Sequence, residues 1–421
     1  MNGLNNKNYN KIILNFNKLF SISNLEKLDW EKIKYFINLF ENNEYTKHIS
    51  IDKLLSYKFR TTNFKNINLY NLNAISLTHN LKRIVFLDGV LNKNMSDLNI
   101  DPWNIKIIYN YKYKLKNKQG DIFYYLTRYL SSKIIRINLP KNKICYEPLY
   151  ILNISSGSKI KNILNIINYN FHIEIGDNSV GSVIEHYISL DKYLYLNLSY
   201  TSINVNNNSN FYYTKLLNEN FYSYHFGYSH ISVNNNSVIN NNVIIFGSLF
   251  NKNQSYTKLN GINSNVFTNS LSLPIKNNIN YINTYIEHNN KNCLSKQLHK
   301  IIVHNKSKGI FEGLIKVNKN AAKTNANMVN NNLLIDPFSK IYTDPKLEIY
   351  DDDVKCSHGS TTNNINNDQI LYLQSRSLSY NLSRQLLLFA FAQSVINEIK
   401  CITTRSLILN YTKNILHGIY I

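Results

Sequence analysis

FHIEIGDNSVGSVIEHYI, residues 171–188, is the stretch that decides the fold class. Apolar and polar residues alternate over 171–175 and again over 182–188, which is the period-two pattern of a strand with one buried face. Gly176, Asp177 and Asn178 lie between the two runs, and these residue types favour tight turns. The stretch therefore predicts two strands joined by a short turn.

The same texture continues from about residue 136 to 365. Short apolar–polar runs such as 243–247 and 313–317 are separated by Asn, Gly, Ser and Asp, and helical periodicity is nearly absent. We predict one large β unit, either a sandwich or a solenoid. Asparagine clusters at expected turns fit the stacked corners of a β-helix, but codon bias explains them equally well, so the pattern leaves both architectures open. These clusters are 206–208, 234–236, 240–242 and 330–332.

Helical patterns flank this unit on both sides. Before residue 80, apolar residues such as Leu25 and Leu28 recur at helical steps, and a strand is expected near 83–89. After residue 365 the helical period returns, with Asn366 and Ser379 placed to cap two helices. We expect a mainly helical amino-terminal domain (1–135), a β core (136–365) and a carboxyl-terminal helical domain (366–421).

The chain is strongly basic, with 47 Lys and Arg, 26 Asp and Glu, and a formal net charge of +21. Such a charge is typical of proteins that neutralise phosphates, so a basic nucleic-acid-binding protein is one hypothesis. The lysines are scattered through every segment without a basic run. Because Asn, Lys, Ile and Tyr are all encoded by AT-rich codons, we attribute the charge to drift in an AT-rich genome and expect no nucleic-acid partner.

The cysteines and the chain ends bear on the compartment. The four cysteines are far apart and form no C-x-x-C pair, which argues against a disulfide framework, a structural zinc site or a self-contained cluster. Residues 1–14 lack the apolar core of a signal peptide, and the apolar run 386–392 is too short to span a membrane. The sequence predicts an intracellular protein of a reducing compartment, without a membrane partner.

Eight blocks between residues 284 and 376 carry a resemblance to a known family. They are TYIEH (284–288), SKQLHK (295–300), FEGLIKV (311–317), KTNA (323–326), NNNLL (330–334), PKLEIY (345–350), DDVKCSHG (352–359) and DQILYLQSR (368–376). In order and spacing they resemble the SufB/SufD family of the SUF machine, which assembles iron–sulfur clusters. The DDVKCSHG string, and residues 83–89 with Ser96-Asp97-Leu98 behind them, resemble the SufD branch in particular.

The resemblance implies a right-handed parallel β-helix core between helical terminal domains, which selects the solenoid. It also implies a non-catalytic scaffold subunit that meets a SufB-like subunit through the β-helix and a SufC-like ATPase through the carboxyl-terminal helical domain. ATP hydrolysis would belong to the SufC-like partner, and this chain has no G-x-x-x-x-G-K-[ST] loop. A homodimer of the isolated chain and a flavin in the assembled complex stay open. The compartment would be bacterial cytoplasm or the stroma of a plastid-type organelle.

Cys356 and His358 are the residues best suited to chemistry. They are two positions apart in a segment that reads as extended, so both project from one face of a strand. Sulfur and imidazole nitrogen both suit iron, but two ligands are too few to hold a cluster tightly. We expect no stably bound cofactor, but a transient iron or iron–sulfur cluster shared with the SufB-like partner. The resemblance implies this interface role for His358.

Other polar residues have weaker claims. The aspartates beside the pair are either carboxylate ligands or a solvated turn; they are Asp351, Asp352 and Asp353. Four residues of the family-like blocks are expected to form a hydrogen-bonded row along the solenoid rather than to do chemistry; they are Glu287, His288, Gln297 and Lys300.

Two further points concern class and local structure. A β-helix carbohydrate-active enzyme is an alternative, but it would need a row of catalytic side chains on one face and usually a secretion signal, and the sequence indicates neither. Where the family usually has Ser-Arg-Gly, this chain has Ser375-Arg376-Ser377. We therefore expect a serine in a left-handed helix terminus, at a cost of about 1 kcal/mol.

Overall fold

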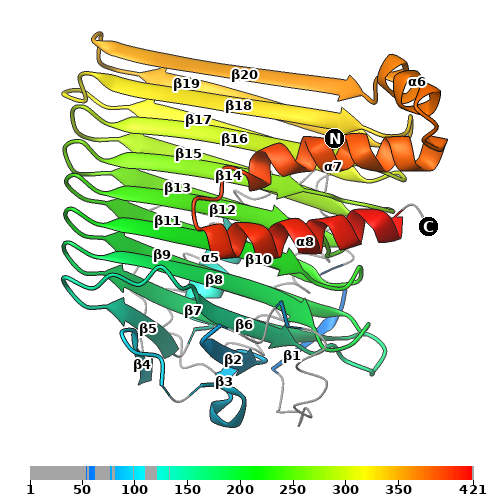
Figure 1. Ribbon diagram of the computed structural model, residues 1–421. Coiled ribbons are helices and arrows are strands. Elements are labelled where there is room, and N and C mark those ends of the chain that lie inside the picture. The colour runs from blue at the N-terminus through cyan, green and yellow to red at the C-terminus, as the bar shows by residue number, and fades with distance from the viewer. Residues whose placement is uncertain are drawn as a thin grey trace, which may run out of the picture.

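The structure is a computed structural model that describes residues 54, 56–61, 76–77, 81–97, 99–109, 121–131 and 133–419. The helical pattern around Leu25 and Leu28 lies outside the described residues. Two ten-stranded sheets dominate the described part, and from β5 to β20 the chain alternates between them strand by strand (Figure 1). This parallel β-solenoid confirms the predicted β-helix core, while its right-handed winding stays a prediction.

The two sheets are named here by their strands. Sheet A contains β1 (Lys58–Thr61), β4 (Asn104–Tyr109), β5 (Lys133–Leu139), β7 (Ile163–Ile175), β9 (Tyr195–Val205), β11 (Tyr224–Val233), β13 (Phe250–Leu259), β15 (Ile279–His288), β17 (Lys308–Val317) and β19 (Lys340–Ile349). Sheet B contains β2 (Arg83–Leu87), β3 (Val90–Leu91), β6 (Leu149–Ser155), β8 (Val180–Ser189), β10 (Asn210–Asn218), β12 (Val238–Ile245), β14 (Asn265–Ser272), β16 (Leu294–Val303), β18 (Thr324–Leu334) and β20 (Val354–Asn364).

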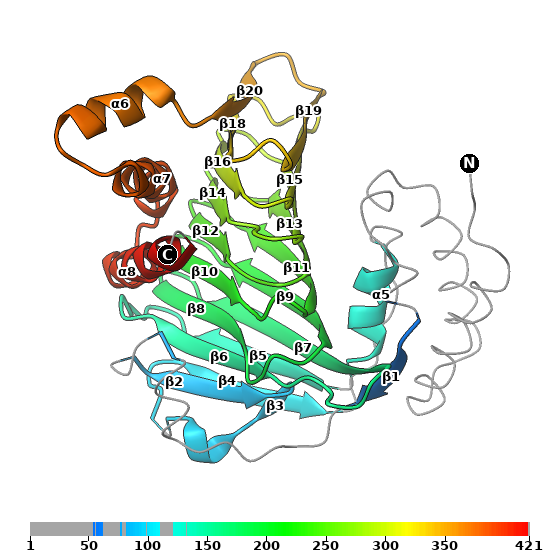
Figure 2. The ribbon, with the colours of Figure 1, turned by 90° about the vertical axis from the view of Figure 1, so that its right-hand side faces the viewer.

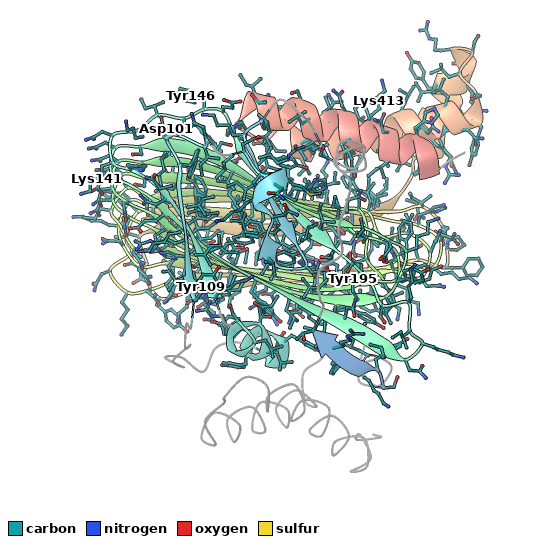
Figure 3. All side chains as sticks on the ribbon, turned by 90° about the horizontal axis from the view of Figure 1, so that it is seen from below. Asp101, Tyr109, Lys141, Tyr146, Tyr195 and Lys413 are labelled. Atoms are coloured by element: carbon teal, nitrogen blue, oxygen red, sulfur yellow. The ribbon has the colours of Figure 1, made fainter. Side chains whose placement is uncertain are left out.

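The strands pair in parallel, except β4 with β5 and β2 with β3. Alternate residues of each strand face the space between the sheets, so Phe171, Ile173 and Ile175 of β7 are fully buried there. Figure 2 shows the two sheets facing each other, and Figure 3 looks along the solenoid, with Tyr195 in the core and Lys413 on the outer side of α8 (Ile402–Ile419). The core is thus one continuous column of inward-facing side chains.

Asparagine builds the turns at one edge of the solenoid, the left edge in Figure 1. Asn178, Asn208, Asn236 and Asn263 have φ of +54° to +57°, the left-handed region that asparagine tolerates better than most residues. Each donates its side-chain amide to the corresponding asparagine of the preceding coil at 3.0–3.1 Å. The predicted stacking of turns is therefore confirmed for 206–208 and 234–236.

For two asparagine clusters the prediction of turns was wrong. Residues 240–242 belong to β12 and residues 330–332 to β18. In β12 the buried amides bond inside the sheet and to neighbouring elements, for example from Asn242 to Asn240 at 2.8 Å. Buried asparagine in these strands is tolerated because partners satisfy part of its hydrogen-bonding capacity.

The strand predicted near 83–89 is β2, which ends in a turn at Asp88 and Gly89. Ser96 and Asp97, which follow η2 (Lys93–Met95), accept hydrogen bonds from the backbone N–H groups of Val85 and Arg83 at 2.9 and 2.6 Å. The Ser96-Asp97 block therefore satisfies backbone donors of β2, which explains why these residue types stand there.

Helices cover the outer faces of both sheets (Figure 2). On sheet A, α5 (Ile122–Tyr129) stacks Phe123 on Phe226, and its N-cap Asp121 forms a buried ion pair with Lys252. On sheet B lie α7 (Tyr380–Ile396) and α8, preceded by α6 (Asn367–Ser375). Asn366 and Ser379 cap α6 and α7 as predicted.

The end of α6 has the left-handed serine that the sequence predicts. Ser377 has φ +67°, its N–H donates to the Gln374 carbonyl, and the Leu378 N–H donates to the Leu373 carbonyl. This is the hydrogen-bonding pattern of a Schellman motif. Serine is accommodated at a position where glycine would be unstrained.

We predict that Asn208→Ala lowers the free energy of unfolding by about 1–3 kcal/mol, because it forces a Cβ-bearing residue without a local amide into the left-handed region and removes two ladder bonds. Asn208→Gly, which removes the amide but keeps the backbone relaxed, should cost less. Urea denaturation of both variants separates the two effects, and equal losses would contradict the role given to the backbone.

Candidate functional site

The solenoid ends in its last coil, formed by β19 and β20. Each of these strands is the terminal strand of its sheet, so within the described residues one edge of each has no strand partner. We call this end, at the top of Figure 1, the open end. The β-branched residues of β20, such as Val354, Thr361 and Thr362, favour its extended backbone.

Cys356 and His358 lie together on the inner side of β20. Their partners in β18 are Ala326 and Met328, both fully buried between the sheets, so the two side chains continue the same inward-facing rows. Cys356 is half-buried against the core, whereas His358 is exposed. The pair is therefore at the rim of the interior, where the solenoid stops.

Burial raises the pKa of the Cys356 thiol above its ordinary value, and a hydrogen bond with the Ala326 backbone acts weakly in the opposite direction. The thiol is accordingly protonated at neutral pH, and any metal that bound it would have to displace its proton. Cys356 is thus better suited to bind a metal transiently than to carry a permanent negative charge.

Next along the inner face of β20 is Ser360, which sequence reasoning missed. Its hydroxyl lies 3.0 Å from that of Thr343 in β19, and Thr343 donates to the Asn330 side chain at 2.9 Å. The first of these bonds joins the two terminal strands beside His358, and the second joins β19 to β18. The two-residue spacing from His358 is the signal that could have placed Ser360 on this face.

The aspartates beside the pair form the turn between β19 and β20. The Asp353 N–H donates to the Asp351 carboxylate at 3.2 Å, and the Asp353 carbonyl accepts from the Lys323 N–H at 2.6 Å. Asp352 and Asp353 are exposed. In the described part of the chain, no three His, Cys, Asp or Glu residues come together as a metal site, so the pair would need ligands from elsewhere.

The four other candidates do not converge on one site. Glu287 lies on the outer face of sheet A, where it accepts hydrogen bonds from Tyr256 and Asn318 and lies 3.5 Å from Lys258. Burial raises the pKa of Glu287, but these hydrogen bonds and Lys258 outweigh it, so the pKa lies below its ordinary value.

His288 and Gln297 face the interior, and Lys300 faces outward. His288 Nε2 lies 2.9 Å from the Ser295 hydroxyl, and Gln297 accepts from Thr284 at 3.0 Å. Lys300 donates to the Phe391 carbonyl at 3.2 Å and to Ser394 at 2.6 Å, both in α7. Lys300 thereby fastens the carboxyl-terminal helices to sheet B.

A buried polar network deeper in the solenoid was also missed. His225 Nδ1 lies 2.8 Å from the Glu219 carboxylate, and neither side chain has exposed surface. Glu185 accepts from Tyr187 and Tyr213, and Lys215 donates to a serine hydroxyl across the interior. Glu185 lies at an inward position of β8 between two core residues, Val183 and Tyr187, and this alternation could have revealed it.

Comparison with known proteins identifies the lineage of this solenoid. Residues 157–391 match the family described as "SUF system FeS cluster assembly, SufBD core domain". The chain is 32% identical over 328 residues to the iron–sulfur cluster assembly protein SufD of Escherichia coli, which covers 78% of this chain and 77% of that protein. It is also 36% identical over 123 residues to the chloroplastic protein ABCI7 of Arabidopsis thaliana, covering 29% of this chain and 26% of that protein.

The fold is therefore that of a β-solenoid protein with an open terminal coil, and the site on it is a Cys–His pair without a complete metal shell. The chain belongs to the SufB/SufD family of the SUF system for iron–sulfur cluster assembly. The longer of the two matches is to SufD, as the sequence blocks predict. No helix of the described chain has the length and apolar character needed to cross a membrane.

Because four histidines are buried, we predict that the free energy of unfolding falls steeply in mild acid. Burial lowers the pKa to about 3 or 4 in four histidines: His186, His230, His288 and His299. Unfolding restores the ordinary pKa near 6.5, so between pH 6.5 and 4 the unfolded chain binds more protons and stability falls as the pH falls. Each histidine contributes about 1.4 kcal/mol per pH unit.

His288→Gln should remove one such contribution between pH 5.5 and 4.5 relative to the unchanged protein. The measurement is the free energy of unfolding in urea at several pH values. His417→Gln, at an exposed position of α8, is the matched control for the substitution itself. A slope that His288→Gln does not alter would contradict the neutral buried state of this histidine.

Proposed function

We propose that the chain is a non-catalytic scaffold subunit of a SUF complex, in which His358 and Cys356 hold iron or a nascent iron–sulfur cluster transiently against a SufB-like subunit. The observation that carries the proposal is the position of the pair, on the inner face of the last strand, where the solenoid is open. A soft sulfur and an imidazole supply two ligands that suit iron, and the partner would supply the others.

The open end has the character of a protein interface. Large apolar side chains remain exposed around it, including Phe338 at 67%, Tyr350 at 54% and Ile349 at 43%. The terminal strands also present backbone groups along their outer edges, which a partner strand can pair with. A SufB-like solenoid, right-handed like the winding proposed for this chain, would cover both features. Asp352 and Asp353 would then lie at the rim of the shared site.

The carboxyl-terminal helices offer a second interface. Apolar residues on α6 and α7 are exposed, among them Leu371 at 63% and Leu386 at 43%. We assign this surface to a SufC-like ATPase, to which ATP hydrolysis would belong. Lys300, through its bonds to α7, would connect motions of these helices to the β-solenoid two coils from the open end.

The relatives bear on the compartment, since one is bacterial and another chloroplastic. We place the chain in bacterial cytoplasm or in a plastid stroma. The transient cluster is cargo in this proposal and no resident cofactor is assigned, while a flavin in the assembled complex and a homodimer of the isolated chain stay open.

His358→Ala in a reconstituted complex with SufB-like and SufC-like subunits should lower the cluster formed per complex by about tenfold or more, because half of the chain's ligand pair is lost. Cys356→Ser should have a smaller effect, since the thiol must first ionise. The measurement is iron and sulfide content after anaerobic reconstitution. Normal yield in an intact complex with His358→Ala would remove this residue from the mechanism.

Leu371→Asp with Leu386→Asp should weaken binding of the SufC-like ATPase by about tenfold or more, because each places a charge in an apolar contact. Titration calorimetry with the purified ATPase measures the effect. Tyr109→Asp, at a position of β4 that is 68% exposed, is the matched control at the far end of the solenoid. If the double variant binds the ATPase as tightly as the Tyr109→Asp control does, the docking surface lies elsewhere.

A further inference from the structure

The middle of the solenoid interior is polar. In sheet A, Asn251 and Asn280 are neighbours in one inward-facing row, and in sheet B Asn241, Thr268 and Gln297 form another. Hydrogen bonds cross between the sheets here, from the Asn241 amide to Ser255 at 3.1 Å and from the Asn280 amide to Ser272 at 2.9 Å. The two rows therefore face the same interior space, over consecutive coils.

Several polar atoms in this space have no hydrogen-bond partner in the described structure. The residues that bear them are at most 2% exposed. Seven such atoms belong to six residues: Asn241 Oδ1, Asn251 Nδ2 and Oδ1, Asn253 Nδ2, Thr268 Oγ1, Asn280 Oδ1 and Gln297 Nε2. Buried polar groups of native proteins are nearly always paired with protein atoms or ordered water, so a cluster of seven indicates a bound species.

The chemistry of these atoms indicates which species is bound. Three of them are amide nitrogens that donate, three are amide oxygens that accept, and the Thr268 hydroxyl can do both. A cation would satisfy only the oxygens and an anion only the nitrogens. Water both donates and accepts, and a buried water typically needs two to four polar partners.

A glycine also shapes the polar interior, at position 227. The point that a Cβ of this glycine would occupy lies 2.9–3.0 Å from His225 Nε2, Asn253 Nδ2 and Lys215 Nζ. Three nitrogens thus gather around a residue without a side chain, and one of them, on Asn253, has no partner. The glycine therefore leaves room for the polar side chains of Lys215, His225 and Asn253 to meet in the interior.

Apolar side chains separate this polar region from the open end. Gln297 lies beside Met328 in sheet B, and Met328 lies beside His358. The Met328 sulfur reaches across to Gly313 of sheet A, where it lies 2.3 Å from the point that a Cβ would occupy, with the Phe311 ring at 2.9 Å. Both Met328 and Phe311 are fully buried. They close the interior one coil below the pair.

We infer that the middle of the solenoid is a closed chamber that binds a row of water molecules, and that Met328 with Phe311 is the plug between this chamber and the open end. The glycine at position 313 makes the plug possible, since any side chain there would displace the thioether. The chamber is a property of this chain alone and does not depend on which partner covers the open end.

Asn251→Leu tests the hydration of the chamber by the sign of its effect. If waters bind Asn251, leucine of similar size leaves those waters with unsatisfied bonds, and the urea midpoint of the full-length protein falls. If the interior is dry, leucine removes two unpaired polar atoms and the midpoint rises, which would overturn the inference. A high-resolution crystal structure gives the direct readout: ordered water beside most of the six residues is expected, and its absence there would also overturn it.

The plug is tested by thiol labelling of Thr284→Cys, whose position lines the chamber opposite Gln297. Methyl methanethiosulfonate is the probe, and mass spectrometry of the peptide containing position 284 gives the rate. Adding Met328→Ala should raise this rate by about tenfold or more, because it opens a path from the rim, whereas Met328→Leu should not. Equal rates in the two folded double variants, or labelling of Thr284→Cys as fast as that of Ser357→Cys on exposed β20, would overturn the plug.

Discussion

The parallel register between successive coils is the constraint on which the rest of the structure depends. Each coil repeats after about 30 residues, as the asparagine ladder shows with separations of 27 to 30 between its members. Backbone hydrogen bonds place equivalent residues of neighbouring coils side by side. A slip of one residue would turn every inward side chain outward, so the register fixes both the core and the placement of every polar group.

The same register explains why one pair of residues differs from its neighbours. The rows that contain Cys356 and His358 contain Ala326 and Met328 one coil earlier, where the side chains are buried by the coil above them. In the last coil no described strand covers the equivalent positions. The accessibility of this pair therefore results from the ending of the solenoid, which exposes inward-facing positions that are core elsewhere.

Much of the fold could be predicted from the sequence, because alternation and turn residues are local signals. The strands β7 and β8, the turn at Asn178 and the caps at Asn366 and Ser379 all follow from neighbouring residues. The choice of a solenoid needed the family resemblance, because strand spacing does not show which strands pair. Asparagines 240–242 and 330–332 were misplaced for a related reason: a turn-favouring residue becomes acceptable in a strand when a distant coil supplies its partner.

The candidate site was likewise predictable only where local spacing decides the structure. Two-residue spacing in an extended segment places Cys356 and His358 on one face, and this needs no knowledge of the fold. It does not show whether that face is inner or outer, nor that Glu287 and Lys300 lie on the outer faces of opposite sheets. Nor does it reveal that Glu185, Lys215 and Glu219 share the interior, since these residues meet only through the coil register.

The polar interior and the asparagine turns both hold neighbouring coils in register. Aliphatic rows such as Ile173, Ile203 and Ile231 would pack almost equally well if one coil slipped by two residues against the next, since neighbouring inward side chains are alike. A bond across the interior such as that from Asn241 to Ser255 exists in one register only, and slipping would leave the amide buried and unpaired. The polar groups that an apolar core would lack thus hold a repetitive solenoid in one register, and this register fixes the place of Cys356 and His358 in its last coil.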